Sequence, residues 1–172
     1  MTSETGSPTL RVAFADSTVG RLLVAGTPRG LCALLIGDDR ALLTADLARR
    51  FPRAVIEPAT AEFEAALAQV VLHVEQPHQT FSLPLDVHGT AFQQRVWQAL
   101  RTIAPGQTRS YAQVAAQIQA PRAYRAVAQA CGANPLAVVI PCHRVVGSDG
   151  ALSGYRWGIA RKAELLRREQ SA

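Results

Sequence analysis

Short apolar runs separated by turn residues fill the first part of the chain. Between residues 10 and 37 the runs "LRVAFAD", "RLLVAG" and "LCALLIG" alternate with the turn sequences "STVG" and "TPRG". This spacing predicts three strands of a small antiparallel meander. Two helices are expected next, over 38–51 and 59–76. Pro52 follows the end of the first helix, and Thr60 can cap the start of the second.

The stretch "PHQTFSLPLDVHG" (77–89) interrupts this pattern. It carries two prolines, so it is expected to be a connection with at most one edge strand. We therefore predict a leader at 1–9, an N-terminal α/β domain at 10–88 and a C-terminal domain at 89–172.

From residue 90 onward the apolar positions recur with helical spacing. One helix is expected over 90–103, and two shorter ones over 111–118 and 122–132. The third has small residues on one face and a polar, basic set on the other: Arg122, Arg125 and Gln129. The last two helices indicate a helix-turn-helix, although an ordinary helical hairpin has the same pattern. A final helix near 158–169 is expected to turn three apolar residues inward: Ile159, Ala163 and Leu166.

Charge divides the chain at the same place. Residues 1–88 hold seven Lys/Arg and ten Asp/Glu, a balance of −3, whereas residues 89–172 hold eleven and three, a balance of +8. A basic C-terminal part favours a polyanionic partner, nucleic acid first, although solubility charge with an accidental bias would give the same numbers. No apolar run is long enough to span a membrane, and the N-terminus lacks the pattern of a secretory signal. We therefore expect a cytoplasmic protein with no membrane partner.

The candidate chemistry lies in "IPCHRVV" (140–146), where Cys142 and His143 are adjacent. The other cysteines and histidines show no metal-ligand spacing, so no metal is predicted. A nucleophilic cysteine needs a base, but adjacent side chains on an extended segment point to opposite faces, so a direct pair requires a tight turn or a bridging water. A buried cysteine that only packs is the alternative.

The surrounding motifs carry a resemblance. "GTAFQQRVWQALRTI", "TRSYAQVA" and "RAVAQACGANPLAVVIPCHRVVGSDGALSGYRWGIARKAELLRRE" resemble the motifs of the O6-alkylguanine-DNA alkyltransferases, in family order. The match covers nearly all of 89–169 and is most similar to the alkyltransferase half of the bacterial Ada proteins. The resemblance implies a ribonuclease H-like N-terminal α/β domain and a mostly helical C-terminal domain of winged-helix or helix-turn-helix type. It also implies direct-reversal DNA repair, in which one alkyl group moves irreversibly from guanine O6 to the protein.

The resemblance also implies roles for individual residues. Cys142 is the alkyl acceptor, His143 its base through a water, and Glu169 the residue that holds the histidine. Asn134 hydrogen-bonds within the site and shapes the turn before Cys142, although Asn-Pro is also a plain turn signal. Tyr111 donates to guanine N3, although it is also an apolar residue at a helix start. The substrate pocket is formed by Val145, Tyr155, Arg156 and Trp157.

For DNA, the resemblance implies that Arg125 fills the space left by a flipped base in the minor groove. Tyr111, Ala112 and Ser148 then contact phosphates. The expected partner is duplex DNA carrying O6-alkylguanine, bound by a monomer that needs no cofactor; O4-alkylthymine is left open as a second substrate. Trp157 departs from relatives with smaller residues there and is expected to narrow the pocket against large adducts such as benzyl.

Two other functions compete with this interpretation. One is a lesion-binding protein without transfer activity, and the presence of Cys142 argues against it. The other is a regulator that reads an operator sequence, which would not need Cys142, His143 and Glu169 together. Cys131 is expected to serve only in packing.

Overall fold

The computed structural model describes residues 8–170, and its first part is a four-stranded sheet. The strands β1 (Thr9–Ser17), β2 (Gly20–Thr27) and β3 (Gly30–Gly37) form the predicted antiparallel meander. A fourth strand, β4 (Val55–Pro58), pairs in parallel with β1, so the sheet is mixed rather than antiparallel. Sequence reasoning missed β4 because its four residues are all exposed and show no alternating pattern.

Of the leader predicted at 1–9, residues 1–7 lie outside the described part of the chain, and Thr9 already begins β1. The connection at 77–89 makes the single edge contact expected of it. Leu31 N donates to the carbonyl of Pro84 at 2.9 Å, and Asp86 N donates to that of Leu31 at 2.7 Å. Only glycine fits at position 30 beside this connection, since φ is +152° and a Cβ would lie 2.5 Å from the Pro84 oxygen.

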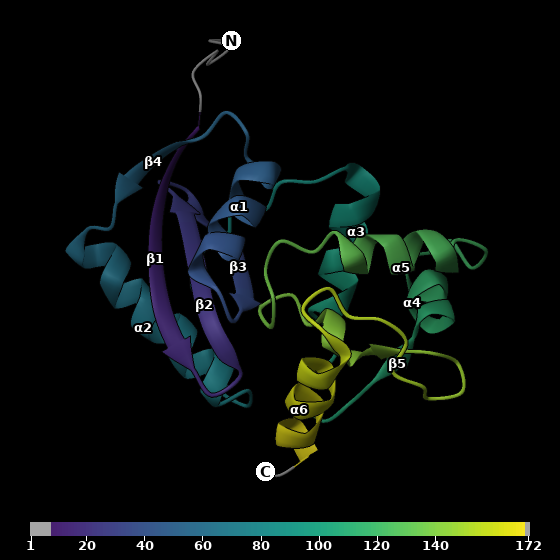
Figure 1. The fold of residues 1–172 in the computed structure, drawn as a ribbon. Helices are drawn as coiled ribbons and strands as arrows, with labels where there is room; N and C mark the ends of the chain where they lie inside the picture. Colours follow the sequence, from purple (N-terminus) through teal and green to yellow (C-terminus); the bar gives the residue numbers. More distant parts are fainter. Residues whose placement is uncertain (1–7, 171–172) are drawn as a thin grey trace.

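Both predicted helices of the first part are present. Helix α1 (Arg40–Arg50) is capped by Asp39. Helix α2 (Ala61–Glu75) is capped by Thr60, as predicted. α1 packs against β2 and β3, and α2 packs against β1. In Figure 1, α1 lies on the side of the sheet that faces the second part of the molecule.

The second part contains the predicted cluster of short helices. These are α3 (Ala91–Leu100), α4 (Tyr111–Gln117) and α5 (Tyr124–Gly132), which pack on one another. Thr90 and Ser110 form capping boxes at the starts of α3 and α4. The inner face of α5 is buried at Val127 and Ala130, and its basic face is exposed, as predicted.

The remaining elements follow α5. The 3₁₀ turn η1 (Cys142–Arg144) leads into β6 (Val145–Val146), which pairs with β5 (Arg109–Ser110), and helix α6 (Ile159–Gln170) completes the described chain.

The predicted inward face of α6 is wrong. Lys162, Leu165 and Glu169 are buried, whereas Ile159 is 51% exposed. Ala163 is also exposed, and Leu166 is only partly buried. The apolar pattern fails here because α6 turns charged side chains toward partners inside the second part. Those partners offset the cost of burying the charges.

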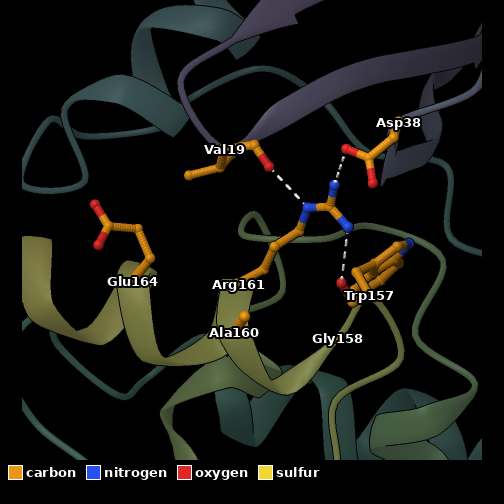
Figure 2. A pocket seen from close by; sticks show the side chains of 7 residues that line it. All are labelled: Val19, Asp38, Trp157, Gly158, Ala160, Arg161 and Glu164. Atoms are coloured by element: carbon orange, nitrogen blue, oxygen red, sulfur yellow. Dashed lines mark hydrogen bonds and ion pairs between the residues drawn. The ribbon is translucent and has the colours of Figure 1, made fainter.

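Side chains of α6 also join the two parts. Figure 2 shows Arg161 reaching from α6 to the β1–β2 turn and to Asp38 beyond β3. Its Nε donates to the Val19 carbonyl at 2.7 Å, and its Nη2 lies 2.6 Å from the Asp38 carboxylate. Within the described residues, no helix is long and apolar enough to cross a membrane.

Candidate active site

Cys142, His143 and Arg144 form one 3₁₀ turn, and all three are buried. The turn is closed by two backbone hydrogen bonds, from Cys142 N to the carbonyl of Ile140 at 2.8 Å and from Arg144 N to that of Pro141 at 3.0 Å. The segment therefore forms a tight turn, which is one of the possibilities that the sequence left open, and not an extended strand. Cys142 is held by Asn134, and His143 and Arg144 both contact Glu169.

Asn134 holds the sulfur of Cys142. Its Nδ2 donates to Cys142 Sγ at 3.1 Å and to the Ile140 carbonyl at 2.8 Å, while its Oδ1 accepts from Leu136 N at 2.9 Å. Asn134 is fully buried, so these bonds satisfy its amide and fix the side chain. The residue thus takes part in the site and braces the turn before Cys142, as the sequence predicted.

His143 and Arg144 share the carboxylate of Glu169. His143 Nε2 lies 2.7 Å from Glu169 Oε1, and Arg144 donates to both carboxylate oxygens at 2.8–3.1 Å. Arg144 Nη1 also donates to the Ile103 carbonyl at 2.6 Å. The predicted His143–Glu169 contact is therefore present, inside a larger buried ion-pair network.

This network sets the protonation of His143. Burial alone would raise the pKa of Glu169, but hydrogen bonds from His143 and Arg144 outweigh it and lower that pKa to about 2. Burial lowers the pKa of His143 despite the nearby Glu169 carboxylate, so the imidazole is neutral at neutral pH. An ionised carboxylate only accepts, so Nε2 carries the proton and Nδ1 keeps a lone pair. Among the described residues, His143 Nδ1 has no hydrogen-bond partner.

The thiol of Cys142 is also neutral at rest. Burial raises its pKa to about 11, although the Asn134 hydrogen bond and the Lys162 ammonium act in the opposite direction. Cysteines that are activated in advance as nucleophiles have a lowered pKa. The structure instead has a neutral thiol and a neutral imidazole in one turn. The thiolate therefore forms only when a base takes the proton of Cys142.

A cavity of about 170 Å³ opens onto Cys142. Tyr111, Tyr155 and Arg156 line it, as does Cys131. The Tyr111 hydroxyl donates to the Ser153 carbonyl at 3.0 Å and so lies at the loop 153–156. The Tyr155 hydroxyl is buried and, within the described chain, has no hydrogen-bond partner. Several of the residues expected to contact the substrate are thus grouped around the sulfur.

Two residues predicted for the pocket are not among those that line the Cys142 cavity. Trp157 lines a separate hollow of about 370 Å³, shown in Figure 2. It packs on two residues of the Cys142 cavity, edge-on against Tyr155 at 5.4 Å between ring centroids and against the Arg156 guanidinium at 5.4 Å from the ring centroid. The effect of its bulk on adduct size therefore stays a prediction. Val145 is fully buried in β6, and the role that the resemblance implies for it belongs to its backbone carbonyl, so that role also stays a prediction.

Sequence reasoning missed two charged residues. Arg144 follows the Cys-His pair directly, and Lys162 lies in α6 with 1% of its surface exposed. Lys162 Nζ donates to the Gly154 carbonyl at 3.0 Å, and burial lowers its pKa. Helical spacing could have found Lys162, because it lies seven residues before Glu169 on the same face of α6.

The candidate DNA contacts lie on the surface. Ala112, Arg125 and Ser148 are exposed, and Tyr111 is half-buried at the cavity. Arg156, in contrast, turns its guanidinium away to Asp46 in α1. No cluster of three or more His, Cys, Asp or Glu side chains suited to a metal occurs among residues 8–170.

Comparison with known proteins agrees with the motifs. The family model described as 6-O-methylguanine DNA methyltransferase, ribonuclease-like domain, matches residues 10–87, and the DNA binding domain of the same family matches 91–171. The chain is 56% identical to the bifunctional transcriptional activator/DNA repair enzyme Ada of Escherichia coli, over 93% of this chain and 45% of Ada. It thus spans about half the length of the Ada proteins.

Shorter relatives match along nearly their whole length. The methylated-DNA–protein-cysteine methyltransferase of Mycobacterium leprae is 41% identical over 90% of this chain and 89% of its own. The crystal structure of Mycobacterium tuberculosis OGT in complex with DNA superposes with a TM-score of 0.77 at 40% identity, covering 95% of this chain and 93% of that one. The chain therefore belongs to the 6-O-methylguanine DNA methyltransferase family.

Proposed function

We propose that this protein repairs O6-alkylguanine in duplex DNA by transferring the alkyl group to Cys142. One observation carries the proposal: the thiol opens onto a cavity and lies in the same turn as His143, a neutral base with an unpartnered Nδ1. Glu169 holds the opposite nitrogen at 2.7 Å, which is the logic of a catalytic triad.

The transfer moves one proton and one alkyl group. His143 takes the thiol proton of Cys142, through a water in the family mechanism, and Glu169 stabilises the resulting imidazolium. The thiolate attacks the alkyl carbon, so an S–C bond forms as the C–O6 bond breaks and its electron pair returns to guanine. Tyr111 donates a hydrogen bond to guanine N3, which stabilises the departing guanine anion. That anion then takes up one proton, and the His143 imidazolium releases the one that it took from the thiol.

The product explains why the reaction occurs once. A thioether is a poor leaving group, so Cys142 is consumed and the protein acts stoichiometrically. The alkyl donor is the DNA itself, which requires no cofactor. In this proposal the protein works in the cytoplasm, at the nucleoid of a bacterial cell.

DNA binding follows from the exposed basic face of α5. The target atom is stacked inside the duplex, so the nucleotide must flip into the cavity. Arg125 then fills the vacated position, and Tyr111, Ala112 and Ser148 contact phosphates. The mycobacterial relative solved with DNA supports a DNA partner for this fold. Phosphate contacts carry little sequence information, which suits a protein that scans all DNA.

Intact mass after incubation with duplex DNA containing O6-methylguanine tests this proposal, for wild type and Cys142→Ala. A gain of one methyl group on the wild type alone supports transfer to Cys142. Lesion binding without a gain would make the protein a recognition factor. A gain on both proteins would assign the acceptor to another residue, Cys131 first, since it lines the same cavity.

A further inference from the structure

Helix α1 belongs to the N-terminal part, yet two of its side chains reach the walls of the Cys142 cavity. Asp46 and Arg50 lie four residues apart, hence on one face of the helix. The Asp46 carboxylate accepts from Arg156 Nη2 at 2.8 and 2.7 Å. Arg50 donates from Nη1 to the Ala133 carbonyl at 3.1 Å and from Nη2 to the Asn134 carbonyl at 3.2 Å.

The two contacts hold different walls. Arg156 lines the cavity from the loop 153–156. The second wall is lined by Cys131 and Gly132, and Asn134, which follows them, donates to Cys142 Sγ. Strand β3 also holds the second wall in place, through its backbone. Leu34 N donates to the Pro135 carbonyl at 2.8 Å, and Ala137 N donates to the Leu34 carbonyl at 3.0 Å. The turn that orients Asn134 is therefore fastened to the N-terminal part by both a side chain and a backbone bridge.

The loop 153–156 has few other restraints. Within the described chain its other hydrogen bonds come from Tyr111, which donates to the Ser153 carbonyl, from Lys162, which donates to the Gly154 carbonyl, and from Gly158 N, which donates to the Tyr155 carbonyl. The Asp46–Arg156 pair is largely shielded, with side-chain exposures of 22% and 19%. A charged pair with two short contacts fixes direction as well as distance. Asp46 therefore determines where the Arg156 wall stands relative to the sulfur.

We infer that helix α1 supports alkyl transfer by holding the two walls of the Cys142 cavity in position. Arg50 and Asp46 are the positioning residues: Arg50 holds the Asn134 wall, and Asp46 holds the Arg156 wall. The inference rests on the proposed function. It gives the N-terminal part a specific task, since neither residue reaches the sulfur itself.

Arg50→Ala tests the Asn134 wall, with Arg50→Lys as the conservative variant and the exposed Arg53→Ala as the matched control. We expect methyl transfer at saturating lesion DNA to slow about 10- to 100-fold in Arg50→Ala, because a small misplacement of the nucleophile is costly. DNA affinity should stay unchanged. Arg50→Lys should be intermediate, and Arg53→Ala should behave as wild type.

A second readout excludes a merely structural role. Alkylation of Cys142 by iodoacetamide, followed by peptide mass across pH, reports on the thiol alone. Without Arg50 the Asn134 amide is misplaced and no longer donates properly to the Cys142 sulfur. The pH at the midpoint of Cys142 alkylation should therefore rise. A lower melting temperature with an unchanged midpoint and unchanged saturating rate would overturn the inference. This readout needs no lesion DNA, so it still reports on Arg50 if the proposed function itself fails.

A double-mutant cycle of Asp46→Asn and Arg156→Gln tests the other wall. If Asp46 acts through Arg156, the double variant should transfer methyl no more slowly than the slower single variant. Additive losses would overturn the assignment of Asp46. Asp16→Asn, which removes a distant exposed carboxylate, is the control.

Discussion

The proposed function divides between two regions of opposite physical character. In the buried cluster around Cys142, five residues are each 5% exposed or less: Asn134, Cys142, His143, Arg144 and Glu169. On the outer face of α5 and just before its start, three polar residues are all exposed: Arg122, Arg125 and Gln129. The first region holds the chemistry and the second is proposed to hold DNA.

The difference teaches where single changes are costly. In the buried cluster each of the five residues hydrogen-bonds to another. Removing one of them therefore leaves a buried polar partner without a hydrogen bond or counter-charge. On the α5 face water replaces any lost contact and salt screens each charge. Variants in the first region should therefore affect stability and rate strongly, whereas variants in the second should affect affinity in small, salt-dependent steps.

Glu169→Gln should have the largest effect. It removes the anion shared by His143 and Arg144 and leaves the Arg144 cation buried without a counter-charge. We expect a loss of about 3–5 kcal/mol in the free energy of unfolding, measured by urea titration, together with loss of methyl transfer. Glu164→Gln removes the carboxylate that Arg167 and Arg168 share at the surface of the same helix, and it should change stability much less. Equal urea midpoints for Glu169→Gln and wild type would contradict the comparison.

Acid should weaken the same cluster in two steps. Burial lowers the pKa of His143 below its usual 6.5. As pH falls, the histidine is therefore protonated in the unfolded chain before it is protonated in the folded one, and the free energy of unfolding begins to fall below pH 6.5. Burial opposes ionisation of Glu169, but His143 and Arg144 lower its pKa from 4.5 to about 2. The stability that this carboxylate contributes above pH 4.5 is therefore lost as the pH falls from 4.5 to 2. This second loss is about 3 kcal/mol.

Urea titrations across this pH range would separate the two steps. His143→Gln should lack the first step, and Glu169→Gln should lack the second. If both variants kept the pH profile of the wild type, titration of the buried cluster would not control acid stability.

Much of the fold could be predicted from the sequence because its elements carry local signals. The meander, the caps at Asp39, Thr60 and Ser110, and the small inner face of α5 all follow from patterns within a few residues. β4 and the inward face of α6 could not, because their placement depends on distant partners. An exposed strand needs only the free edge of β1, and a buried lysine needs a carbonyl supplied by another segment.

The site shows the same limit. Motifs singled out Cys142, His143, Glu169 and Asn134, and the structure brings them together. They did not reveal that Trp157 lines a neighbouring hollow, or that the α1 side chains Asp46 and Arg50 hydrogen-bond to Arg156 and to the carbonyl of Ala133. Contacts across more than 80 residues of sequence leave no periodic trace in a single chain.

Tyr111→Phe lies between the two regions and should have an intermediate effect. The hydroxyl is half-buried at the cavity and is proposed to stabilise the departing guanine. Losing this donor should slow single-turnover methyl transfer about 10- to 100-fold, less than for a fully enclosed donor. DNA affinity should fall by no more than a few-fold, because Tyr111 is also proposed to contact a phosphate, so the rates are compared at saturating DNA. Tyr124→Phe on the exposed side of α5 is the control, and equal rates for both variants would remove Tyr111 from the chemistry.

Arg125→Ala should have the smallest effect and should show the character of the exposed region. We expect weaker binding to lesion duplex and a decrease of about 1 in the slope of log affinity against log salt concentration, because one cation no longer releases a counterion. Unfolding should be unaffected, and methyl transfer at saturating DNA should stay within a few-fold of wild type. The exposed Arg53→Ala, in the N-terminal part, should leave the slope unchanged. If Arg125→Ala instead kept the salt slope but lost transfer at saturating DNA, Arg125 would control base flipping before transfer and not affinity, and the division between buried chemistry and exposed binding would not hold.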